Sequence, residues 1–425
     1  MKIPFLDSVP GRISANFLSE AAIVLGDIKE SMKMRKNTAM ETTLIKLKKE
    51  VLKSFPGKVV YLYNSPSAAM NQFLNSFTKA YTNPVLAVSL FGLPCVSDFA
   101  LKERCQIFQL PINPLTLEPD YFAIQKLNTD SKICVVMDNL CGFTDNFSVT
   151  HGSGLMGYFI LNDLSEVFFG LGEKNKDIKN AFLFSIFSFG ANYMDNGGMV
   201  CSHNLSDLPG EFKFLGDNTD YSDVDISMEA YRRYKEYPPK KPEDSNQMTL
   251  WKMVDSLVKL RTLPSRIHAF AATAKAWSVI FAGKPIVQPI VQRRIEISAN
   301  SCPTAYPIVM PNQNLTDRML KILRDLKIDA MRLVDGIPLD QSDLATLKKK
   351  EIFDRTFIQS ELLAKRTIIL PIDDAVVTHD QINAVGQILL KDFPAQQENT
   401  QKSSPLNSLI TATATTPTQQ DVPQS

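Results

Sequence analysis

The stretch FSFGANYMDNGGMV, residues 187–200, decides how the chain is interpreted. It ends the apolar run KNAFLFSIFSFG and leads into a second apolar run, GGMVCSHN. A strand, a tight polar turn and a reversed strand explain this order, because the Gly-Gly pair lets the backbone turn back. The turn contains Asn192 and Tyr193 and no lysine. The identity of the residues in this turn is therefore the starting point for interpreting the chain.

Similar apolar runs precede this stretch and alternate with helical segments. Runs of strand type occupy residues 57–63, 83–92, 105–110, 131–142, 157–170, 179–190 and 197–204. Strands that alternate with helices over about 200 residues predict an α/β fold with a mostly parallel central sheet. Their near-continuous apolar character indicates a sheet covered by helices on both faces.

Helical periodicity is clearest before and after this block. The segment METTLIKLKKEVLKSF (40–55) places Leu44, Leu47, Val51 and Leu52 on one face, with lysines opposite. Further along, MTLWKMVDSLVKL (248–260) and PSRIHAFAATAKAWSVIFAG (264–283) predict two separate helices.

The chain divides into three parts by composition. Residues 1–290 form a predicted large domain, with a polar insertion at about 204–246 that we interpret as a linker or surface loop. Residues 291–393 form a smaller α+β domain whose last helix is capped at Thr378. Residues 394–425 are rich in Gln, Thr, Ser and Pro, which predicts a disordered tail.

The bulk composition limits the classes of function. A net charge of +1 gives no electrostatic argument for nucleic acid. No apolar run is long enough to span a bilayer and the first residues do not resemble a secretory signal, so we expect no membrane partner and a cytoplasmic location. The six cysteines and four histidines show no metal-ligand spacing, which predicts reduced cysteines and no metal site.

Taken in order, these segments resemble the DegT-type nucleotide-sugar aminotransferases. That family consists of PLP-dependent enzymes with the aspartate-aminotransferase fold (fold type I). The resemblance runs from KIPFLD to about Phe393 and depends on the order and spacing of five weak motifs. These are NSPSAAM (64–70), VSLFGL (88–93), the pair NPLTLEPDYFAIQKL and ICVVMDNLCGFTDN (113–127 and 133–146), YFILNDLSEVFFG (158–170), and the opening stretch.

The resemblance assigns roles near the cofactor phosphate and the cofactor ring. It implies that Ser67 and Ala68 hold the phosphate at a helix N-terminus, where amides and the helix dipole favour an anion. It implies that Asp163 pairs with the pyridinium nitrogen. Glu166 stands where the family has glutamine, and Ser188 matches the family's Ser-Phe pair.

Two further positions depart from the family or remain open. Gly92 falls where the family has a stacking aromatic ring, so we expect the adjacent Phe91 to lie in the core. The segment PSRIHAFAATAKAW resembles one near the family's dimer interface, where Arg266 and His268 face either the site or solvent.

Tyr193 occupies the position of the family's lysine, which binds PLP as a Schiff base and moves the proton. Tyrosine forms no imine, and its pKa of about 10 makes it a poor base near neutral pH. Loss of general acid–base catalysis alone removes roughly 10²- to 10⁴-fold in rate.

Three hypotheses follow from this change. The first is a degenerate sugar aminotransferase, or pseudoenzyme, that keeps the fold and a cofactor or nucleotide-sugar pocket but lacks turnover. The second is a sugar-modifying enzyme, similar to dehydratases of this fold, that binds PLP or PMP without a covalent link. The third is a non-catalytic scaffold protein. The resemblance also implies a homodimer.

Overall fold

The computed structural model describes only part of the chain, and every structural statement below concerns that part. The described residues are 15–35, 37–92, 96, 105–127, 130–144, 158–171, 182–191, 195–201, 208, 210–212, 226–236, 248–282, 284, 302–336, 355–374 and 376–392.

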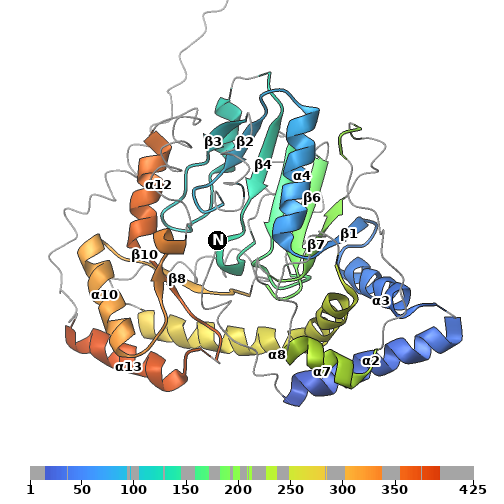
Figure 1. The fold of residues 1–425 in the computed structure, drawn as a ribbon. Coiled ribbons are helices and arrows are strands. Elements are labelled where there is room, and N and C mark those ends of the chain that lie inside the picture. Colours follow the sequence, from blue (N-terminus) through green and yellow to red (C-terminus); the bar gives the residue numbers. More distant parts are fainter. Residues whose placement is uncertain are drawn as a thin grey trace, which may run out of the picture.

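A seven-stranded sheet with strand order β1-β7-β6-β5-β4-β2-β3 forms the centre of the large part of the protein (Figure 1). Its strands are β1 (Val59–Tyr63), β2 (Val85–Val88), β3 (Gln106–Gln109), β4 (Ile133–Met137), β5 (Phe159–Leu164), β6 (Phe182–Ser188) and β7 (Gly197–Cys201). Neighbouring strands are parallel except that β7 runs antiparallel to both β1 and β6. The predicted mostly parallel sheet and its reversed strand after the Gly-Gly pair are thus confirmed.

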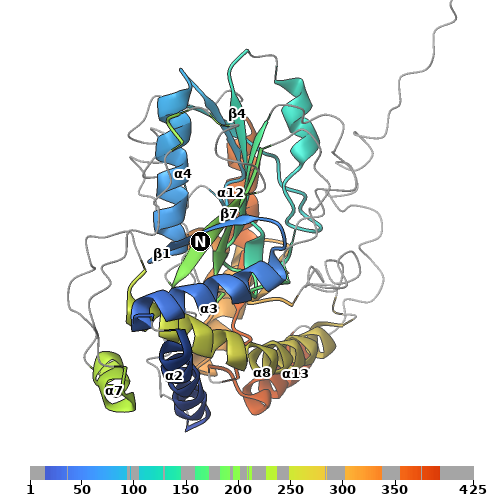
Figure 2. The same cartoon turned by 90° about the vertical axis from the view of Figure 1, so that its right-hand side faces the viewer.

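Helix α4 (Pro66–Ala80) covers one face of this sheet (Figure 2). Its side chains Met70, Phe73, Leu74 and Phe77 are fully buried, and the ring centroids of Phe73 and Phe184 on β6 lie 4.7 Å apart. Each fully buried aromatic or aliphatic side chain contributes roughly 1.5–3 kcal/mol of hydrophobic free energy. The apolar face of α4 therefore fixes this helix against the centre of the sheet.

Three helices and a short 3-10 helix cover the opposite face. Near β1 and β7 these are α2 (Ala15–Arg35), α3 (Ala39–Ser54) and the first half of α8 (Leu250–Phe281), and near β3 and β4 it is η1 (Tyr121–Lys126). On α3, Leu44, Leu47 and Val51 are buried as predicted, whereas Leu52 is 39% exposed. Of the four residues predicted to share the buried face, Leu52 was therefore wrong.

Helix α8 is continuous, which corrects the prediction of two helices on either side of Pro264. Its first half buries Met253 and Val254, and its second half buries Phe270 and Trp277. Proline inside a helix costs about 3 kcal/mol. Packing on both sides of Pro264 offsets this cost, because each half is held by its own set of buried side chains.

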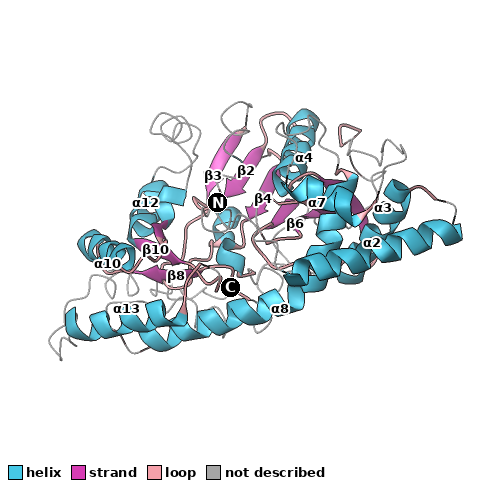
Figure 3. Ribbon diagram, turned by 60° about the horizontal axis from the view of Figure 1, so that its bottom comes forward, coloured by secondary structure: helices cyan, strands magenta, loops and turns pink. Residues whose placement is uncertain are grey.

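The second half of α8 leads to a smaller antiparallel sheet (Figure 3). This sheet has strand order β8-β10-β9, with β8 (Tyr306–Val309), β9 (Met331–Arg332) and β10 (Thr367–Leu370). Helices α10 (Gln313–Asp325), α12 (Arg355–Arg366) and α13 (His379–Asp392) accompany it, and the short helix η4 (Leu333–Gly336) directly follows β9. Another short helix, η2 (Leu140–Gly142), follows β4 of the large sheet. Thr378 and Gln381 form a capping box at the start of α13, which confirms the predicted cap.

The two sheets share one hydrophobic core. Trp277 is fully buried, and its indole Nε1 donates a 2.9 Å hydrogen bond to the carbonyl oxygen of Pro371, in the segment after β10. The predicted domain boundary at 290 lies outside the described residues and stays a prediction, as does the tail at 394–425.

The predicted surface loop at 204–246 contains helix α7 (Met228–Glu236). Tyr231 on this helix is fully buried, and its hydroxyl donates to Asp255 Oδ1 at 3.1 Å. The interpretation of the whole insertion as a surface loop is therefore wrong for this segment. The flanking sequence is rich in lysine and proline, so composition alone did not predict that Tyr231 is buried.

In the described part of the chain, which leaves out Cys95, five cysteines are free and buried: Cys105, Cys134, Cys141, Cys201 and Cys302. Among the helices that the structure describes, none has the length and apolar character needed to cross a membrane.

Candidate functional site

The first turn of α4 lies at the edge of the sheet where the parallel strands end. Tyr63 on β1 and Ser188 on β6 both pair with Gly197 on β7, which places these residues in one row across the sheet. A Cβ atom at Gly197 would lie 2.9 Å from Cγ of Pro66, the first residue of α4. Glycine therefore lets the N-terminus of α4 approach β7 closely at Gly197, the residue that pairs with Ser188.

Ser65 caps α4 at this edge. Its side chain oxygen accepts a 3.1 Å hydrogen bond from the amide of Ala68, and Pro66 occupies the first turn without an N–H to donate. Ser67, half-buried, is in the same turn. The Ala68 amide is therefore already used by the Ser65 side chain. The phosphate-binding role of Ser67 and Ala68 stays a prediction.

Two carboxylates lie side by side at the ends of the neighbouring strands β4 and β5. The register pairs Met137 with Asn162, so the next residues, Asp138 and Asp163, are adjacent. Asp163 is 2% exposed, and its Oδ1 accepts a 2.9 Å hydrogen bond from the amide of Ser165. The structure thus places Asp163 at the strand end that the resemblance requires.

Asn139 and Glu166 complete this acidic cluster. The side chain amide of Asn139 donates to the carbonyl oxygen of Asp163 at 2.8 Å and to Asn162 Oδ1 at 2.7 Å. Glu166 is 5% exposed, and its Oε2 accepts from the amide of Cys141 at 3.4 Å. Burial, and then the charge of Asp163, raise the pKa of Glu166 above its ordinary value.

Asp138 is a residue that the sequence analysis missed. Burial raises its pKa to about 6, and the neighbouring Asp163 carboxylate adds to this rise, although a hydrogen bond from Ser89 opposes it. A carboxyl group with this pKa exchanges a proton near neutral pH. The available signal was its position directly after a buried parallel strand, next to the strand that ends at Asp163.

A tight turn after β2 closes over Asp138. The side chain oxygen of Ser89 accepts from the amides of Phe91 and Gly92 at 3.0 and 3.1 Å while its hydroxyl donates to Asp138. A Cβ atom at Gly92 would lie 3.2 Å from Cβ of Asp138. Phe91 is buried as expected, so neither residue presents an aromatic ring from this turn to a ligand above the carboxylates.

The turn after β6 is anchored to α8. The amide of Phe189 donates to the carbonyl oxygen of Asn196 at 3.0 Å, and the side chain amide of Asn196 donates to the carbonyl oxygen of Lys252 at 3.2 Å. Asn192 and Tyr193 lie outside the described residues. The expectation that Tyr193 faces a cofactor pocket therefore stays a prediction.

Lys259 on α8 contacts this turn and was not considered in the sequence analysis. Its ammonium group forms ion pairs with Asp195 in the turn and, at 2.9 Å, with Asp255 on α8. Burial by itself lowers the pKa of Lys259, but the two carboxylates outweigh burial and raise it. This lysine is therefore held protonated and is a poor nucleophile.

The predicted residues on α8 have different surroundings. Arg266 lies 5.9 Å from the ring centroid of Phe168 and 5.8 Å from that of Phe270, which is cation–π geometry. His268 is exposed. Arg266 thus packs against the core on the aromatic residue that follows β5, and His268 does not.

The raised pKa of Asp138 gives a testable pH dependence of stability. Its pKa rises from 3.8 to about 6, so the folded protein binds a proton more tightly than the unfolded chain, and stability falls as the pH rises from 4 to 6. We expect Asp138→Asn to stabilise the protein above pH 6 by about 1–3 kcal/mol and to leave it unchanged near pH 4.

Urea unfolding at several pH values measures this effect. Asp325→Asn, at an exposed carboxylate of α10, is the control and should change stability by less than about 0.5 kcal/mol. An Asp138→Asn variant that is equally destabilised at pH 4 and pH 8 would show that the raised pKa is not the cause.

Known proteins resemble this chain in structure and not in sequence. No family model matches the chain, and no curated protein matches it. A solved GDP-4-keto-6-deoxymannose-3-dehydratase, with a trapped PLP–glutamate geminal diamine, is 16% identical with a TM-score of 0.62 over 86% of this chain and 97% of that chain. The Helicobacter pylori aminotransferase PseC, of pseudoaminic acid biosynthesis, is 16% identical with a TM-score of 0.59 over 88% of this chain and 96% of that chain.

A third solved structure broadens the chemistry that this fold accommodates. A 3-amino-5-hydroxybenzoic acid synthase is 10% identical with a TM-score of 0.58 over 87% of this chain and 95% of that chain. At these identities the similarity establishes the fold, and the site has to be argued from its own residues. The chain has the predicted fold type I architecture, which it shares with sugar aminotransferases and with a sugar dehydratase that binds PLP.

Proposed function

We propose that this protein is a DegT-type, sugar-aminotransferase-like protein that has lost lysine-dependent transamination of a keto nucleotide sugar. The observation that carries the proposal is the state of Lys259. Among the described residues, it is the lysine whose ammonium pairs with Asp195, in the segment that follows β6, and it also pairs with Asp255. A lysine that is held protonated between two carboxylates replaces neither the Schiff-base nucleophile nor the proton carrier of the family.

The acidic cluster fits a cationic ring nitrogen. Asp138, Asp163 and Glu166 are all at most 9% exposed, and burial raises the pKa of Asp138 and of Glu166. A protonated pyridine nitrogen beside them would stabilise their charged forms. Asp163 would hold it, and the first turn of α4, with Ser67 and the nearby Ser188, would face the phosphate. When bound, PLP or PMP supplies an electron sink.

Asp138 favours a second candidate, a sugar-modifying enzyme that uses PLP or PMP without a covalent link. A carboxyl group with a pKa of about 6, buried beside Asp163, can hold or release a proton at neutral pH without a lysine. Among the solved structures of this fold is a GDP-4-keto-6-deoxy-D-mannose-3-dehydratase with bound hydrated PLP. Both candidates include a nucleotide-sugar ligand, no metal, and a homodimer as the assembly.

Cofactor binding tests these candidates. We expect PMP to bind without a covalent link, and Asp163→Asn to weaken its affinity by at least tenfold because the ion pair to the ring nitrogen is lost. The control is Asp120→Asn, at the exposed cap of η1, which should bind PMP as the wild type does. Absorbance and fluorescence titration measure the affinity.

Product analysis then separates the candidates. Amino transfer from PMP to a 4-keto nucleotide sugar would overturn the loss of transamination. Dehydration of the sugar, abolished in Asp138→Asn, would support the second candidate. Absence of any response to PLP and PMP would overturn the second candidate, and absence of nucleotide-sugar binding as well would leave the third hypothesis, a scaffold protein.

A further inference from the structure

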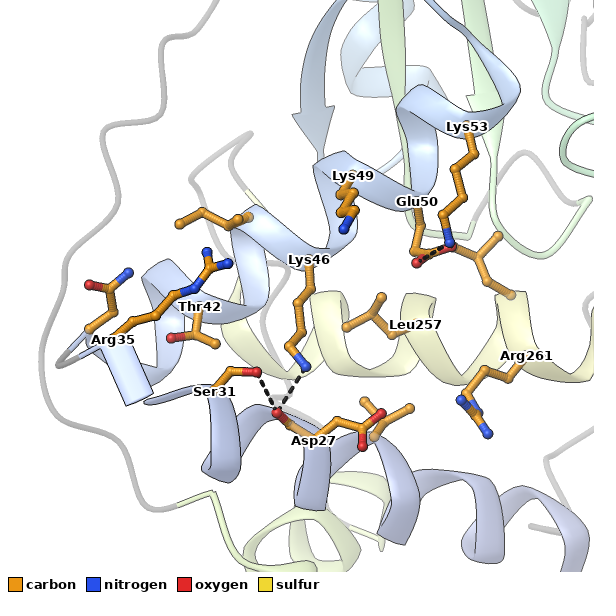
Figure 4. Close-up of a pocket in the computed structure, with 14 residues that line it drawn as sticks. Asp27, Ser31, Arg35, Thr42, Lys46, Lys49, Glu50, Lys53, Leu257 and Arg261 are labelled. Carbon is orange, nitrogen blue, oxygen red and sulfur yellow. Dashed lines mark hydrogen bonds and ion pairs between the residues drawn. The ribbon is translucent and has the colours of Figure 1, made fainter. Parts of the chain in front are cut away.

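A cavity of about 540 Å³ lies between α2, α3 and α8. Its wall is built from the three helices that cover the β1–β7 part of the sheet, and it includes none of the residues of the acidic cluster (Figure 4). Volumes of about 300–1,000 Å³ are typical of small-molecule sites. The cavity is therefore large enough for a ligand separate from the proposed cofactor.

Helix α3 supplies a row of lysines to this cavity. Lys46, Lys49 and Lys53 follow at helical spacing, so they project from one side of the helix, and all three line the cavity (Figure 4). Lys46 Nζ donates to the carbonyl oxygen of Asp27 at 2.8 Å, which holds the ammonium in place without neutralising it. Lys53 forms a 2.7 Å ion pair with Glu50.

The lining has an excess of positive charge. Its cationic side chains are Arg35, Lys46, Lys49, Lys53 and Arg261, and its acidic side chains are Asp27 and Glu50. Five positive and two negative charges leave an excess of three, which Glu20 reduces by pairing with Arg261 at 2.6 Å. Clustered positive charges repel one another and attract an anion. Several separate cations match a ligand with several negative charges.

A buried hydroxyl in the lining needs a partner. Thr42 is 4% exposed, and its Oγ1 has no hydrogen-bond partner among the described residues. Leaving such a group unpaired costs about 1–3 kcal/mol. An anionic oxygen in the cavity would accept the Thr42 proton. The hydroxyl is thus a second feature, independent of the lysines, that points to an oxygen-bearing ligand.

The remaining lining is apolar and indicates that the ligand has an apolar part. Val24, Ile45, Leu257 and Leu260 border the same space. We propose that the cavity binds a small organic polyphosphate, with its phosphates on Lys46, Lys49 and the Thr42 hydroxyl and its apolar part on the aliphatic side chains. The α2–α3–α8 layer would then be a second ligand site on the protein.

Calorimetric titration with ATP and with inorganic tripolyphosphate tests the proposal. We expect ATP to bind more tightly than tripolyphosphate, because only ATP can use the aliphatic wall. Lys46→Glu combined with Lys49→Glu should weaken ATP binding on the order of tenfold or more. Lys29→Glu is the control, since Lys29 is exposed on α2 and lies outside the cavity lining.

Thr42→Val separates binding from stability. Valine keeps the shape and removes the unpaired hydroxyl, so the free protein should be as stable as the wild type or more stable, while ATP binds several-fold more weakly. PMP binding should stay unchanged in all these variants. A variant that loses both ATP and PMP binding has a folding defect. A wild-type protein that binds ATP but not PMP would contradict the cofactor proposal alone.

Four results would overturn the proposal. These are no binding of either probe, equal affinity for ATP and tripolyphosphate, equal loss in the Lys29→Glu control, and tighter binding of a single-stranded oligonucleotide that Thr42→Val does not affect. The last would assign the lysine row to nucleic acid.

Discussion

Gly197→Ala should destabilise the protein by about 3 kcal/mol or more, or prevent its folding. The added Cβ atom would lie 2.1 Å from the carbonyl oxygen of Phe187 and 2.9 Å from Cγ of Pro66. The first contact is with the backbone of β6, to which β7 is paired, so it cannot be relieved by a change of side chain conformation. Overpacking at well-filled sites typically costs 1–3 kcal/mol, and a backbone contact this short exceeds that case.

Gly26→Ala is the matched control for Gly197→Ala. Gly26 lies inside α2, and a Cβ atom added there meets nothing within 4 Å. Alanine should therefore stabilise the protein by about 0.5–1 kcal/mol through helix propensity. Chemical denaturation of both variants gives the comparison. A Gly197→Ala variant with wild-type stability would mean that α4 does not pack on β7 as described.

Lys259→Met should destabilise the protein by about 2–4 kcal/mol. The substitution leaves Asp195 and Asp255 without this ammonium group, although Lys235 still pairs with Asp255 at 2.7 Å. Removing one partner of a buried ion pair costs more than the pair itself contributes, because the remaining charge stays desolvated. The segment after β6 loses one of its contacts with α8 at the same time, while the hydrogen bond from Asn196 to Lys252 remains. Thermal and urea unfolding measure the loss.

The control for Lys259→Met is Lys53→Met. Lys53 pairs with Glu50 at the surface, where the two side chains are 61% and 39% exposed, so its loss should cost less than about 1 kcal/mol. Equal losses in the two variants would show that burial does not strengthen the Lys259 ion pairs.

The same ion pairs predict a dependence on acid. Burial alone raises the pKa of Asp255, but Lys259 and Lys235 lower it to about 2. The lowered pKa stabilises the folded state fully above pH 4, and this stabilisation is lost as the pH falls from 4 to 2. In Lys259→Met the acid-induced loss should shift to higher pH. An unchanged acid transition would mean that Lys259 does not control this carboxylate.

Local patterns in the sequence were sufficient where one segment carries the whole signal. The apolar run before the Gly-Gly pair and the run after it predicted the reversed strand β7, and the Thr378 cap predicted the start of α13. The predicted helix boundaries were incorrect where tertiary packing outweighs the local conformational preference of a residue. Pro264 is the clearest example, because buried side chains on both sides keep α8 continuous across a residue that normally ends a helix.

The candidate site could be predicted in part from the sequence. The resemblance pointed to Asp163 because its motif stands at the end of one recognisable strand, and its role there stays a prediction. Asp138 was missed because its importance depends on the parallel register that places it beside Asp163, from a strand about 25 residues earlier. Lys259 was missed because the ion pair with Asp195 joins residues 64 positions apart.

The sequence by itself determined the α/β class, the strand order along the chain and the absence of a lysine between Phe187 and Val200. These depend on hydrophobic periodicity, on turn residues and on residue identity, which are local properties. Only the tertiary structure decided that Asp138 has a raised pKa, that Lys259 is held between two carboxylates, and that the lysines of α3 line a cavity. The protonation state and the burial of a side chain depend on which distant segments pack against it, and the packing of the sheet and helices fixes those contacts.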